Sequence, residues 1–251
     1  MEIAIISGAS SGLGIEFYKQ IQSEKLDEVW IIARREEKLN EISEKYGKIK
    51  TRILPLDLCK SESISKIYNI LCDEKPNVKF LFNNAGMGLW GDVYDADFIS
   101  QGNMVDLNVR ALTEMSTICV KFMGEKSYII NTCSIASFVP NARMSVYSAT
   151  KAYVMSYTKS LRYELKKKKI NVCAICPGPM ETEFLAVAGI DKDLSKAFRS
   201  LPYCNVEKVA KKGIKSAKNG KCVYTPRTFY KFYRLVAKIL PHSLLMGMSK
   251  T

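Results

Sequence analysis

Tyr147 and Lys151 lie four residues apart in the segment Tyr-Ser-Ala-Thr-Lys. Residues at i and i+4 share one face of an α-helix. A tyrosine hydroxyl has a pKa of about 10 and exchanges protons poorly at neutrality, but a neighbouring ammonium favours the phenolate and lowers that pKa. The pair therefore predicts a tyrosine that exchanges a proton with a substrate oxygen while the lysine tunes it.

A glycine loop near the start of the chain is a second chemical signal. The segment Ser7-Gly8-Ala9-Ser10-Ser11-Gly12-Leu13-Gly14 follows an isoleucine-rich run and precedes residues of helical period. Glycines there allow a tight turn and a close approach of the backbone to a pyrophosphate, which the N-terminus of the next helix then faces. No Lys-Ser/Thr pair follows the last glycine, which disfavours a Walker-type phosphoryl-transfer loop. The loop predicts a dinucleotide site.

The end of the second apolar run bears on which dinucleotide binds. An NAD site usually has an acidic residue there for the ribose 2′-hydroxyl, whereas this chain has Ala33-Arg34-Arg35. Two guanidinium groups suit a 2′-phosphate. The alternative is that both arginines are solvated loop residues. We expect NADP(H) in preference to NAD(H).

Short apolar runs alternate with segments of helical period along most of the chain. The runs cover 2–7, 29–33, 52–56, 80–83, 128–132, 170–176 and 222–224, and the helical segments cover 13–21, 37–46, 61–72, 103–123, 147–167 and 205–217. Nearly continuous apolar strands between amphipathic helices indicate a parallel sheet covered on both faces. We expect an α/β fold, a single doubly wound Rossmann domain over 1–251, with about seven parallel strands and helices on both faces.

Two segments interrupt or follow this alternation. Residues 179–204 come after the sixth strand, at the edge where open α/β sheets bind ligands, and are expected to form a substrate lid. Residues 226–251 form an amphipathic extension, and its run 228–241 is aromatic, basic and roughly helical in period. Three uses compete for this run: covering the substrate pocket, packing on another subunit, or lying on a membrane surface. We favour the first two over peripheral membrane contact.

Composition places the chain among ordinary globular proteins. Its 251 residues are 47% hydrophobic and 25% charged. The net charge of +13 raises nucleic acid or anionic membrane as partners, but the densest cationic run, Lys166 to Lys169, follows a helical segment and suits a solvated helix end. No nucleic-acid partner is expected. No apolar run reaches about 18 residues and the chain begins Met-Glu, so we expect a cytoplasmic protein without a transmembrane segment.

The eight cysteines are too sparse for a disulfide scaffold and are expected to be reduced thiols. Cys173 and Cys176 form a Cys-x-x-Cys within an apolar run, where strand alternation sends i and i+3 to opposite faces. No second Cys or His pair follows them. We expect them to pack in the core and predict no metal site.

These motifs, with Asn83-Asn84-Ala85-Gly86, Asn108, Ser134 and Pro177-Gly178, resemble those of the classical short-chain dehydrogenases/reductases in order and approximate spacing. The resemblance covers about residues 2–225. It implies hydride transfer between a nicotinamide cofactor and a carbonyl or alcohol carbon, in a homodimer or homotetramer. The implied catalytic residues are Asn108, Ser134, Tyr147 and Lys151.

The resemblance also implies a role for each residue. Tyr147 is the general acid/base, and Lys151 lowers its pKa and hydrogen-bonds the nicotinamide ribose. Ser134 polarises the substrate oxygen, and Asn108 holds a water that connects Lys151 to solvent. The cofactor-binding residues expected from the loop, the arginines and the resemblance are Gly8, Ser10, Ser11, Gly12, Leu13, Gly14, Arg34, Arg35, Asp57, Leu58, Asn84, Ala85, Gly86, Tyr147, Lys151, Pro177, Gly178 and Thr182.

The expected substrate side is largely apolar, which suits a bulky hydrophobic ketone or secondary alcohol such as a hydroxysteroid or bile acid. The same side chains would also serve to pack the lid on the sheet. The substrate contacts that we expect are Trp90, Ser134, Phe138, Met144, Met180 and Phe184.

Other functions fit parts of the pattern. A serine hydrolase built on Ser134 is excluded because its surroundings lack a G-x-S-x-G elbow and the single histidine, His242, lies in the tail. Reduction of a 3-oxoacyl thioester or a sugar-like ketone is a rival within the same chemistry. A non-catalytic NADP-sensing binding protein is a rival outside it, which the combination of serine, tyrosine and lysine argues against.

Overall fold

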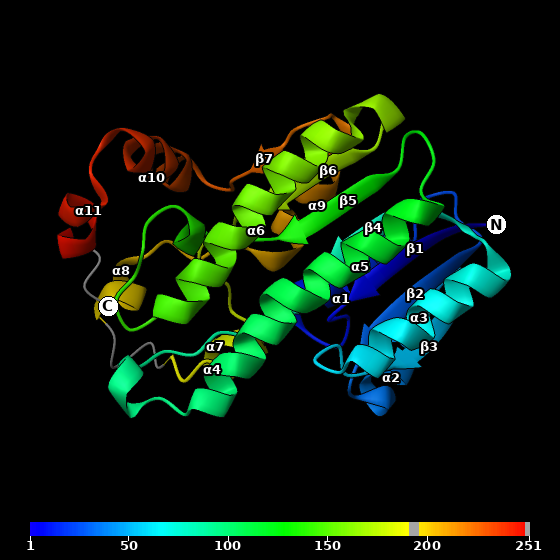
Figure 1. The fold of residues 1–251 in the computed structure, drawn as a ribbon, viewed down its shortest axis with the longest axis horizontal. Coiled ribbons are helices and arrows are strands. Elements are labelled where there is room, and N and C mark those ends of the chain that lie inside the picture. Colours follow the sequence, from blue (N-terminus) through cyan, green and yellow to red (C-terminus); the bar gives the residue numbers. More distant parts are fainter. Residues whose placement is uncertain (191–195, 249–251) are drawn as a thin grey trace.

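The computed structural model describes residues 1–190 and 196–248 of the chain. Within these residues, seven strands form one parallel sheet in the order β3-β2-β1-β4-β5-β6-β7 (Figure 1). The strands are β1 (Glu2–Ser7), β2 (Glu28–Ala33), β3 (Lys50–Pro55), β4 (Asn77–Asn83), β5 (Tyr128–Thr132), β6 (Asn171–Ile175) and β7 (Val223–Tyr224). The sheet confirms the predicted doubly wound fold.

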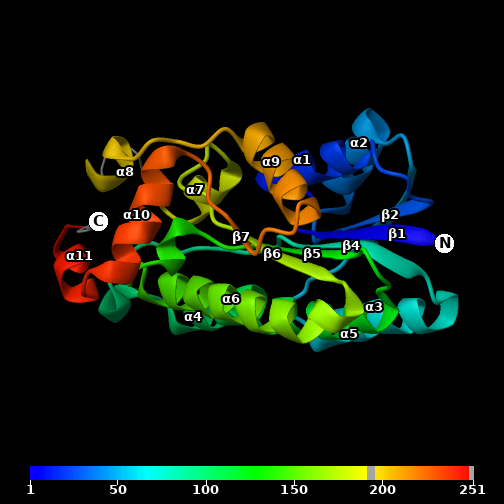
Figure 2. The same ribbon diagram turned by 90° about the horizontal axis from the view of Figure 1, so that it is seen from above.

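Helices cover both faces of the sheet (Figure 2). One layer contains α1 (Gly12–Ile21), α2 (Glu36–Tyr46) and α9 (Val206–Lys218), and the other contains α3 (Ser61–Glu74), α4 (Phe98–Val105), α5 (Leu112–Cys119) and α6 (Ser145–Glu164). The apolar spacing of these helices explains the two layers, because α1 buries Leu13, Phe17 and Ile21 while α3 buries Ile64, Ile67 and Leu71. Each layer therefore forms its own core against one face of the sheet.

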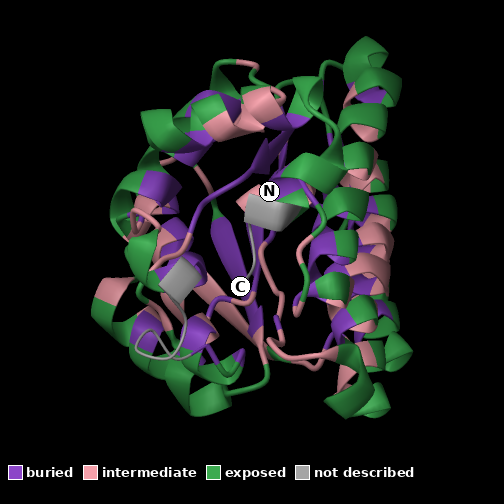
Figure 3. Ribbon diagram, turned by 90° about the vertical axis from the view of Figure 1, so that its left-hand side faces the viewer, coloured by how far each residue is buried: buried purple, intermediate pink, exposed green. Residues whose placement is uncertain are grey.

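The strands are apolar on both faces because both faces are covered. Ile3 and Ile5 of β1 pack in one core, and their neighbours Ala4 and Ile6 pack in the other. Figure 3 shows buried strands between helices whose outer sides are exposed. Because β1 has β2 on one side and β4 on the other, the chain reverses its winding there, and the carboxyl ends of β1 and β4 open the crevice used by doubly wound folds.

The predicted helix 103–123 is broken into several pieces. After α4 comes a π-helical turn, Asp106–Ala111, then α5 and a 3-10 turn, Val120–Phe122. The apolar spacing continues through the π turn, so the sequence pattern does not reveal it. A π turn carries an extra residue, which shifts the faces of α4 and α5 relative to each other, and it contains Asn108.

Short helices occupy the two irregular segments. The predicted lid contains α7 (Glu183–Val187) and α8 (Lys196–Ser200), and its residues 191–195 lie outside the described residues. The tail forms α10 (Thr228–Ile239) and α11 (His242–Met248), and its residues 249–251 lie outside the described residues. Among the parts of the chain that are described, no helix is both long and apolar enough to cross a membrane.

Candidate active site

A cavity of about 1040 Å³ opens at the carboxyl ends of the strands. It joins the glycine loop, the end of β2, the end of β5, the start of α6 and the segment after β6, as the predicted site requires. The predicted cofactor residues that line it are Gly8, Ser10, Ser11, Gly12, Leu13, Arg34, Arg35, Asp57, Leu58, Asn84, Ala85, Gly86, Tyr147, Lys151, Pro177, Gly178 and Thr182.

Gly14 lies behind the cavity wall. A Cβ on Gly14 would come within 2.0 Å of the Gly8 carbonyl oxygen, so only glycine lets the first turn of α1 pack against the loop. Gly12 has φ of +48°, a left-handed conformation that favours glycine. The loop thus brings the N-terminus of α1 to the cavity, where its free backbone N–H groups suit a pyrophosphate.

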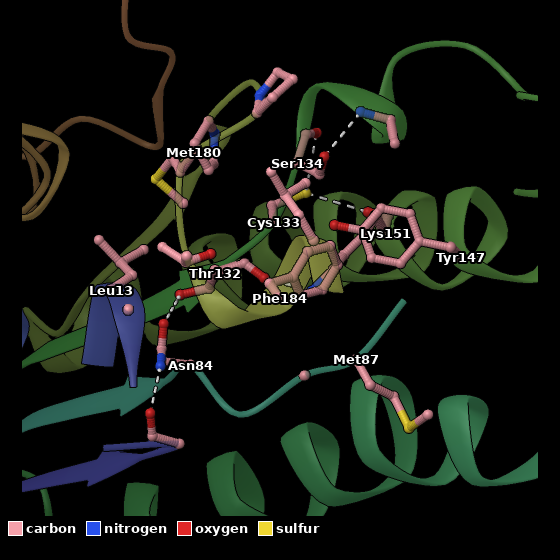
Figure 4. Close-up of a pocket in the computed structure, with 18 of the residues that line it drawn as sticks. Leu13, Asn84, Met87, Thr132, Cys133, Ser134, Tyr147, Lys151, Met180 and Phe184 are labelled. Carbon is pink, nitrogen blue, oxygen red and sulfur yellow. Dashed lines mark hydrogen bonds between the residues drawn. The ribbon is translucent and has the colours of Figure 1, made fainter. Parts of the chain in front are cut away.

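Hydrogen bonds tie the ends of β1, β4 and β5 together beneath the cavity. The Ser7 hydroxyl accepts from the Asn84 and Ala85 backbone N–H groups at 2.9 and 3.0 Å. The Asn84 amide donates to the Ser7 and Gly8 carbonyls, and its oxygen accepts from the Thr132 hydroxyl at 3.0 Å. Asn84 therefore fixes the glycine loop relative to the strand that precedes Ser134 (Figure 4).

A second polar network lies deeper and was not predicted. The Asn83 amide donates to Ser116 and to Asn131, each at 2.9 Å. Asn131 donates in turn to Thr158 of α6 at 2.9 Å. These four buried side chains connect β4, β5, α5 and α6, so they set the position of the helix that carries Tyr147 and Lys151. The available signal was Asn131 within the apolar run of β5, together with Asn83 at the end of β4.

Ser134 and Tyr147 meet in the cavity (Figure 4). The Ser134 oxygen accepts the Ala136 backbone N–H at 3.1 Å, which leaves its hydroxyl hydrogen free to donate. Burial raises the pKa of Tyr147 above its ordinary value, and the hydrogen bond with Ser134 acts in the opposite direction. The phenol is therefore a neutral proton donor at neutral pH, beside a second donor from Ser134.

Lys151 corrects one expectation from the sequence. Its Nζ donates to the Thr132 carbonyl at 2.9 Å and lies 5.7 Å from the centre of the Tyr147 ring. Burial of the phenol outweighs the hydrogen bond with Ser134, so the pKa of Tyr147 is raised rather than lowered. Burial also lowers the pKa of Lys151 itself. The two side chains share a helix face as predicted, but the predicted direction of the tyrosine shift is wrong for this structure.

Asn108 is buried behind the loop that follows β4. Its amide oxygen accepts from the Met87 backbone N–H at 3.0 Å, and its Nδ2 donates to the Met87 carbonyl and to Thr150. Thr150 donates to the Tyr147 carbonyl at 2.7 Å. The side chain of Asn108 thus holds the 87 loop and α6 together and is not among the residues that line the cavity; the water relay stays a prediction.

Three buried cysteines, Cys133, Cys173 and Cys176, lie in or just after strands β5 and β6. Cys173 and Cys176 pack in different cores, as the strand alternation predicts. Cys176 instead neighbours Cys133, one residue past β5, and both are buried. Burial opposes ionisation of both thiols and holds the pKa of Cys176 well above its ordinary value, whereas hydrogen bonds and the Lys151 charge outweigh burial at Cys133 and lower its pKa. This contact between strands has no signal in the sequence spacing.

The substrate end is apolar and differs in part from expectation. Ser134, Met144, Met180 and Phe184 line the cavity, whereas Trp90 and Phe138 do not. The Trp90 ring lies 3.6 Å from the Arg143 guanidinium, and the Phe138 ring packs 6.1 Å from Tyr233 of α10. Helix α10 supplies the remaining wall, so of the three uses considered for the run 228–241 the structure shows it covering the pocket. The α10 side chains in this wall are Phe229, Tyr230, Phe232, Tyr233 and Val236.

Arg35 has a partner already. Its guanidinium donates to the Ser10 carbonyl and hydroxyl, at 3.3 and 3.2 Å, and to the Glu183 carboxylate at 2.7 Å. Arg34 also lines the cavity, at the end of β2. The two arginines therefore lie where the prediction places them, and an acidic residue from α7 competes for one of them.

No group of three or more His, Cys, Asp or Glu side chains is arranged to hold a metal ion within residues 1–190 and 196–248. A nucleotide loop joined to a phenol and a hydroxyl in one cavity suits proton transfer beside a bound dinucleotide.

Comparisons with known proteins agree with this geometry. An uncharacterized oxidoreductase of Staphylococcus epidermidis is 27% identical over 183 residues, which cover 72% of this chain and 79% of that protein. A short-chain dehydrogenase from Sphingobium yanoikuyae in complex with NADPH has the same fold, with a TM-score of 0.81 and 23% identity over 98% of this chain and 96% of that one.

A short chain dehydrogenase/reductase from Burkholderia phymatum in complex with NAD has a TM-score of 0.83 and 19% identity, over 100% of this chain and 95% of that one. At these identities the structural matches show the fold. The family model described as short chain dehydrogenase matches residues 2–193, most of the chain. This protein therefore belongs to the short-chain dehydrogenase family of oxidoreductases, which use NAD(P).

Proposed function

We propose that the protein is an NADP(H)-dependent oxidoreductase that interconverts a ketone and a secondary alcohol by hydride transfer. The observation that carries the proposal is the meeting of the Tyr147 phenol, the Ser134 hydroxyl and the Lys151 ammonium in the cavity that the glycine loop also lines. A binding protein would need the nucleotide loop alone, whereas this cavity also holds a proton donor at its substrate end.

The residues present fit a nicotinamide dinucleotide. The left-handed turn at Gly12 and the close packing of Gly14 bring backbone N–H groups to the cavity for the pyrophosphate. Asp57, Asn84 and Thr182 line the remaining path toward Tyr147. When bound, the cofactor supplies or accepts the hydride, and the protein supplies orientation and the proton.

Side chains of the protein transfer the proton that accompanies the hydride. In reduction, Tyr147 donates its proton to the carbonyl oxygen, and the Ser134 hydroxyl donates a hydrogen bond to the same oxygen and stabilises its developing negative charge. In oxidation, the tyrosinate accepts the proton of the alcohol. Lys151, held at the Thr132 carbonyl, supplies positive charge next to the phenol as it gives up its proton.

The preference for NADP(H) rests on Arg34 and Arg35, because the similar structures contain NADPH in one case and NAD in another. Both arginines line the cavity at the end of β2. Among the described residues that directly follow β2, no Asp or Glu lines the cavity. Arg35 already binds the hydroxyl of Ser10. A 2′-phosphate would replace this neutral partner with a charged one and would compete with Glu183 for the guanidinium.

The apolar lining of the substrate end supports a bulky hydrophobic ketone or alcohol of the hydroxysteroid or bile-acid kind. Met144, Met180, Phe184 and the aromatic residues of α10 surround the Tyr147 end of the cavity. Few groups there hydrogen-bond a sugar's hydroxyls, which disfavours a sugar-like ketone. A panel of steroid, 3-oxoacyl and sugar ketones, followed by NADPH absorbance, separates these substrates.

We also propose a homo-oligomer in a reducing compartment such as the cytoplasm. Exposed apolar side chains at Val105 and Tyr153 lie on neighbouring helices of one layer and offer a surface for a second copy. All eight cysteines are free thiols, which suits a reducing compartment.

The decisive experiment is Tyr147→Phe. We expect kcat for ketone reduction to fall by about 10²- to 10⁴-fold, because the variant lacks the proton donor, while NADPH binding measured by fluorescence stays close to wild type. Tyr163→Phe, on an exposed residue of the same helix, is the matched control and should leave both values unchanged. An active Tyr147→Phe enzyme would refute the proposed mechanism.

A further inference from the structure

Helix α10 exposes a continuous apolar face at the mouth of the cavity. Phe229, Phe232, Leu235 and Ile239 are 54%, 66%, 54% and 71% exposed. Spacings of three and four residues place them along one side of the helix. The opposite side of α10 is where the helix packs on the protein, through the buried side chains of Tyr230 and Ala237. Covering the pocket therefore uses only part of the apolar surface of this helix.

The charged side chains of α10 that border this face are all positive. Lys231 and Lys238 are exposed and border the apolar stripe about two turns apart, with the partly exposed Arg234 between them. No acidic residue follows Glu207 in the chain. An apolar helix face with a cationic border and no anions is typical of a helix that lies in a membrane interface.

Other exposed apolar side chains lie at the same end of the molecule. Leu240, Leu244 and Met246 continue the stripe beyond α10. Tyr94, in the 3-10 turn Val93–Asp95, and Phe98, the first residue of α4, are 85% and 81% exposed. They lie on the other side of that end, where the exposed Asp95 and Asp97 flank them (Figures 1 and 2). Figure 3 looks directly onto this end. Clustered apolar exposure of this kind marks an interaction surface.

We propose that this end of the protein docks on an anionic lipid surface, with α10 lying in the interface. A second copy of the chain fits the same face less well. A symmetric dimer would set the patch against itself, which would bring Lys231, Arg234 and Lys238 toward their own copies, and neither α10 nor α11 has a carboxylate that could neutralise them. Anionic headgroups supply the missing negative charge, and the acyl region accepts the aromatic and aliphatic side chains.

The docked orientation connects the bilayer to the cavity. Phe232 and Val236 line the cavity, while Leu235 and Ile239 on the same helix do not and are exposed. The apolar wall of the site thus continues onto the outer surface, so a lipid-soluble ketone would reach Tyr147 without crossing water. This route rests on the proposed reductase function, whereas the docking itself does not.

Vesicle binding tests the docking without measuring turnover. Purified full-length protein is sedimented with vesicles of phosphatidylglycerol and phosphatidylcholine, or of phosphatidylcholine alone. We expect binding to the anionic vesicles that weakens as salt is added, because the screened charges contribute less. Equal binding to both compositions, or none to the anionic vesicles, would overturn the proposal.

Two double variants separate the apolar contribution to vesicle binding from the ionic contribution. Leu235→Gln with Ile239→Gln, and Lys231→Ala with Lys238→Ala, should each lower partitioning onto anionic vesicles by about tenfold or more. The matched controls are Tyr163→Gln on α6 and Lys211→Ala with Lys212→Ala on α9, which are exposed on other faces and should bind as the wild type does. Unchanged partitioning of the α10 variants would overturn the proposal.

Light scattering on the same variants tests whether a second copy of the chain, in place of lipid, covers α10. We expect the Leu235→Gln, Ile239→Gln protein to keep the wild-type oligomeric state and the wild-type reduction rate for a water-soluble ketone. If it dissociates instead, a second copy covers α10 and the lipid proposal fails. If vesicle binding is lost while reduction persists, docking is established independently of the catalytic proposal.

Discussion

At the scale of single residues, the environment of Tyr147 determines in which protonation state the site rests. The i, i+4 spacing identified the correct pair, and the structure places both side chains in the cavity. The sequence could not show how deeply the phenol is buried or that the lysine is held by the Thr132 carbonyl. The expected shift is reversed because burial disfavours the charged form of the tyrosine by more than the hydrogen bond with Ser134 favours it.

The pH dependence of reduction tests this reversal. A raised pKa keeps Tyr147 protonated through neutrality, so we expect kcat for reduction to stay level between about pH 6 and 9 and to fall only when the phenol ionises at higher pH. Alcohol oxidation needs the tyrosinate and should accelerate as pH rises. Steady-state profiles in both directions check this. A reductase rate that already declines near pH 7 would instead support the lowered pKa predicted from the sequence.

Glu183 is a residue that the sequence analysis did not single out. Its carboxylate holds the Arg35 guanidinium at 2.7 Å across the cavity mouth, and both side chains are about half exposed. Glu183→Gln should free Arg35 for a 2′-phosphate and increase NADPH affinity by up to about fivefold, the scale of an exposed ion pair. Fluorescence titration with NADH, which lacks that phosphate, is the internal control and should not change. An equal gain for NADH would remove Arg35 from the proposed phosphate site.

At the scale of elements, strand and helix types followed the sequence pattern closely, and the departures have local causes. β4 begins at Asn77, three residues before the predicted start, because Asn77 pairs with β1 although it is polar. The π turn around Asn108 is likewise decided by tertiary contacts with Met87 and Thr150. Periodicity reports which side of an element is apolar, and it carries no information on such hydrogen bonds.

Strand β2 begins with a buried carboxylate, Glu28, which lies just before the apolar run 29–33 that the sequence predicted for this strand. Glu28 is almost inaccessible and accepts a hydrogen bond from Trp30 at 2.8 Å. Lys50 and Arg52 of β3 lie 3.2 and 3.4 Å from its oxygens. Burial alone would raise the pKa of Glu28, but the hydrogen bond and the two cations outweigh it and lower the pKa. The charged form therefore helps to join β2 to β3.

Glu28→Gln should lower the free energy of unfolding by about 1–2 kcal/mol at pH 7. A depressed native pKa stabilises the fold above the unfolded pKa of about 4.3, and this contribution is lost as pH falls through the native value. The difference between variant and wild type in urea denaturation should therefore shrink in acid. Glu41→Gln, in an exposed pair with Lys38, is the control and should change stability little. A gap between Glu28→Gln and wild type that persists in acid would contradict this account.

At the scale of the whole molecule, the parallel sheet brings distant segments to one edge. The glycine loop, the arginines and the catalytic residues belong to β1, β2, β5 and α6, and only the topology explains why one cavity contains them all. The meeting of these segments at one edge could be predicted, since a chain of alternating strands and helices can adopt only a few sheet topologies. The return of α10 over the cavity was one of the two uses favoured from the sequence, but the amphipathic pattern alone does not distinguish a pocket cover from a subunit contact.

Since the cofactor would touch both halves of the sheet, its binding should stabilise the entire fold. A ligand at one hundred times its Kd adds about 2.7 kcal/mol to the free energy of unfolding. For a chain of this size that corresponds to a rise in Tm of about 5–10 °C. We expect NADPH to give this shift in a thermal melt and NADH, at the same concentration, to give a smaller one. The double variant Arg34→Ala, Arg35→Ala should reduce the NADPH shift to that of NADH, because both cofactors share every contact except the 2′-phosphate. Equal shifts for the two cofactors in the wild type would refute the NADP(H) preference while leaving the dinucleotide site itself intact.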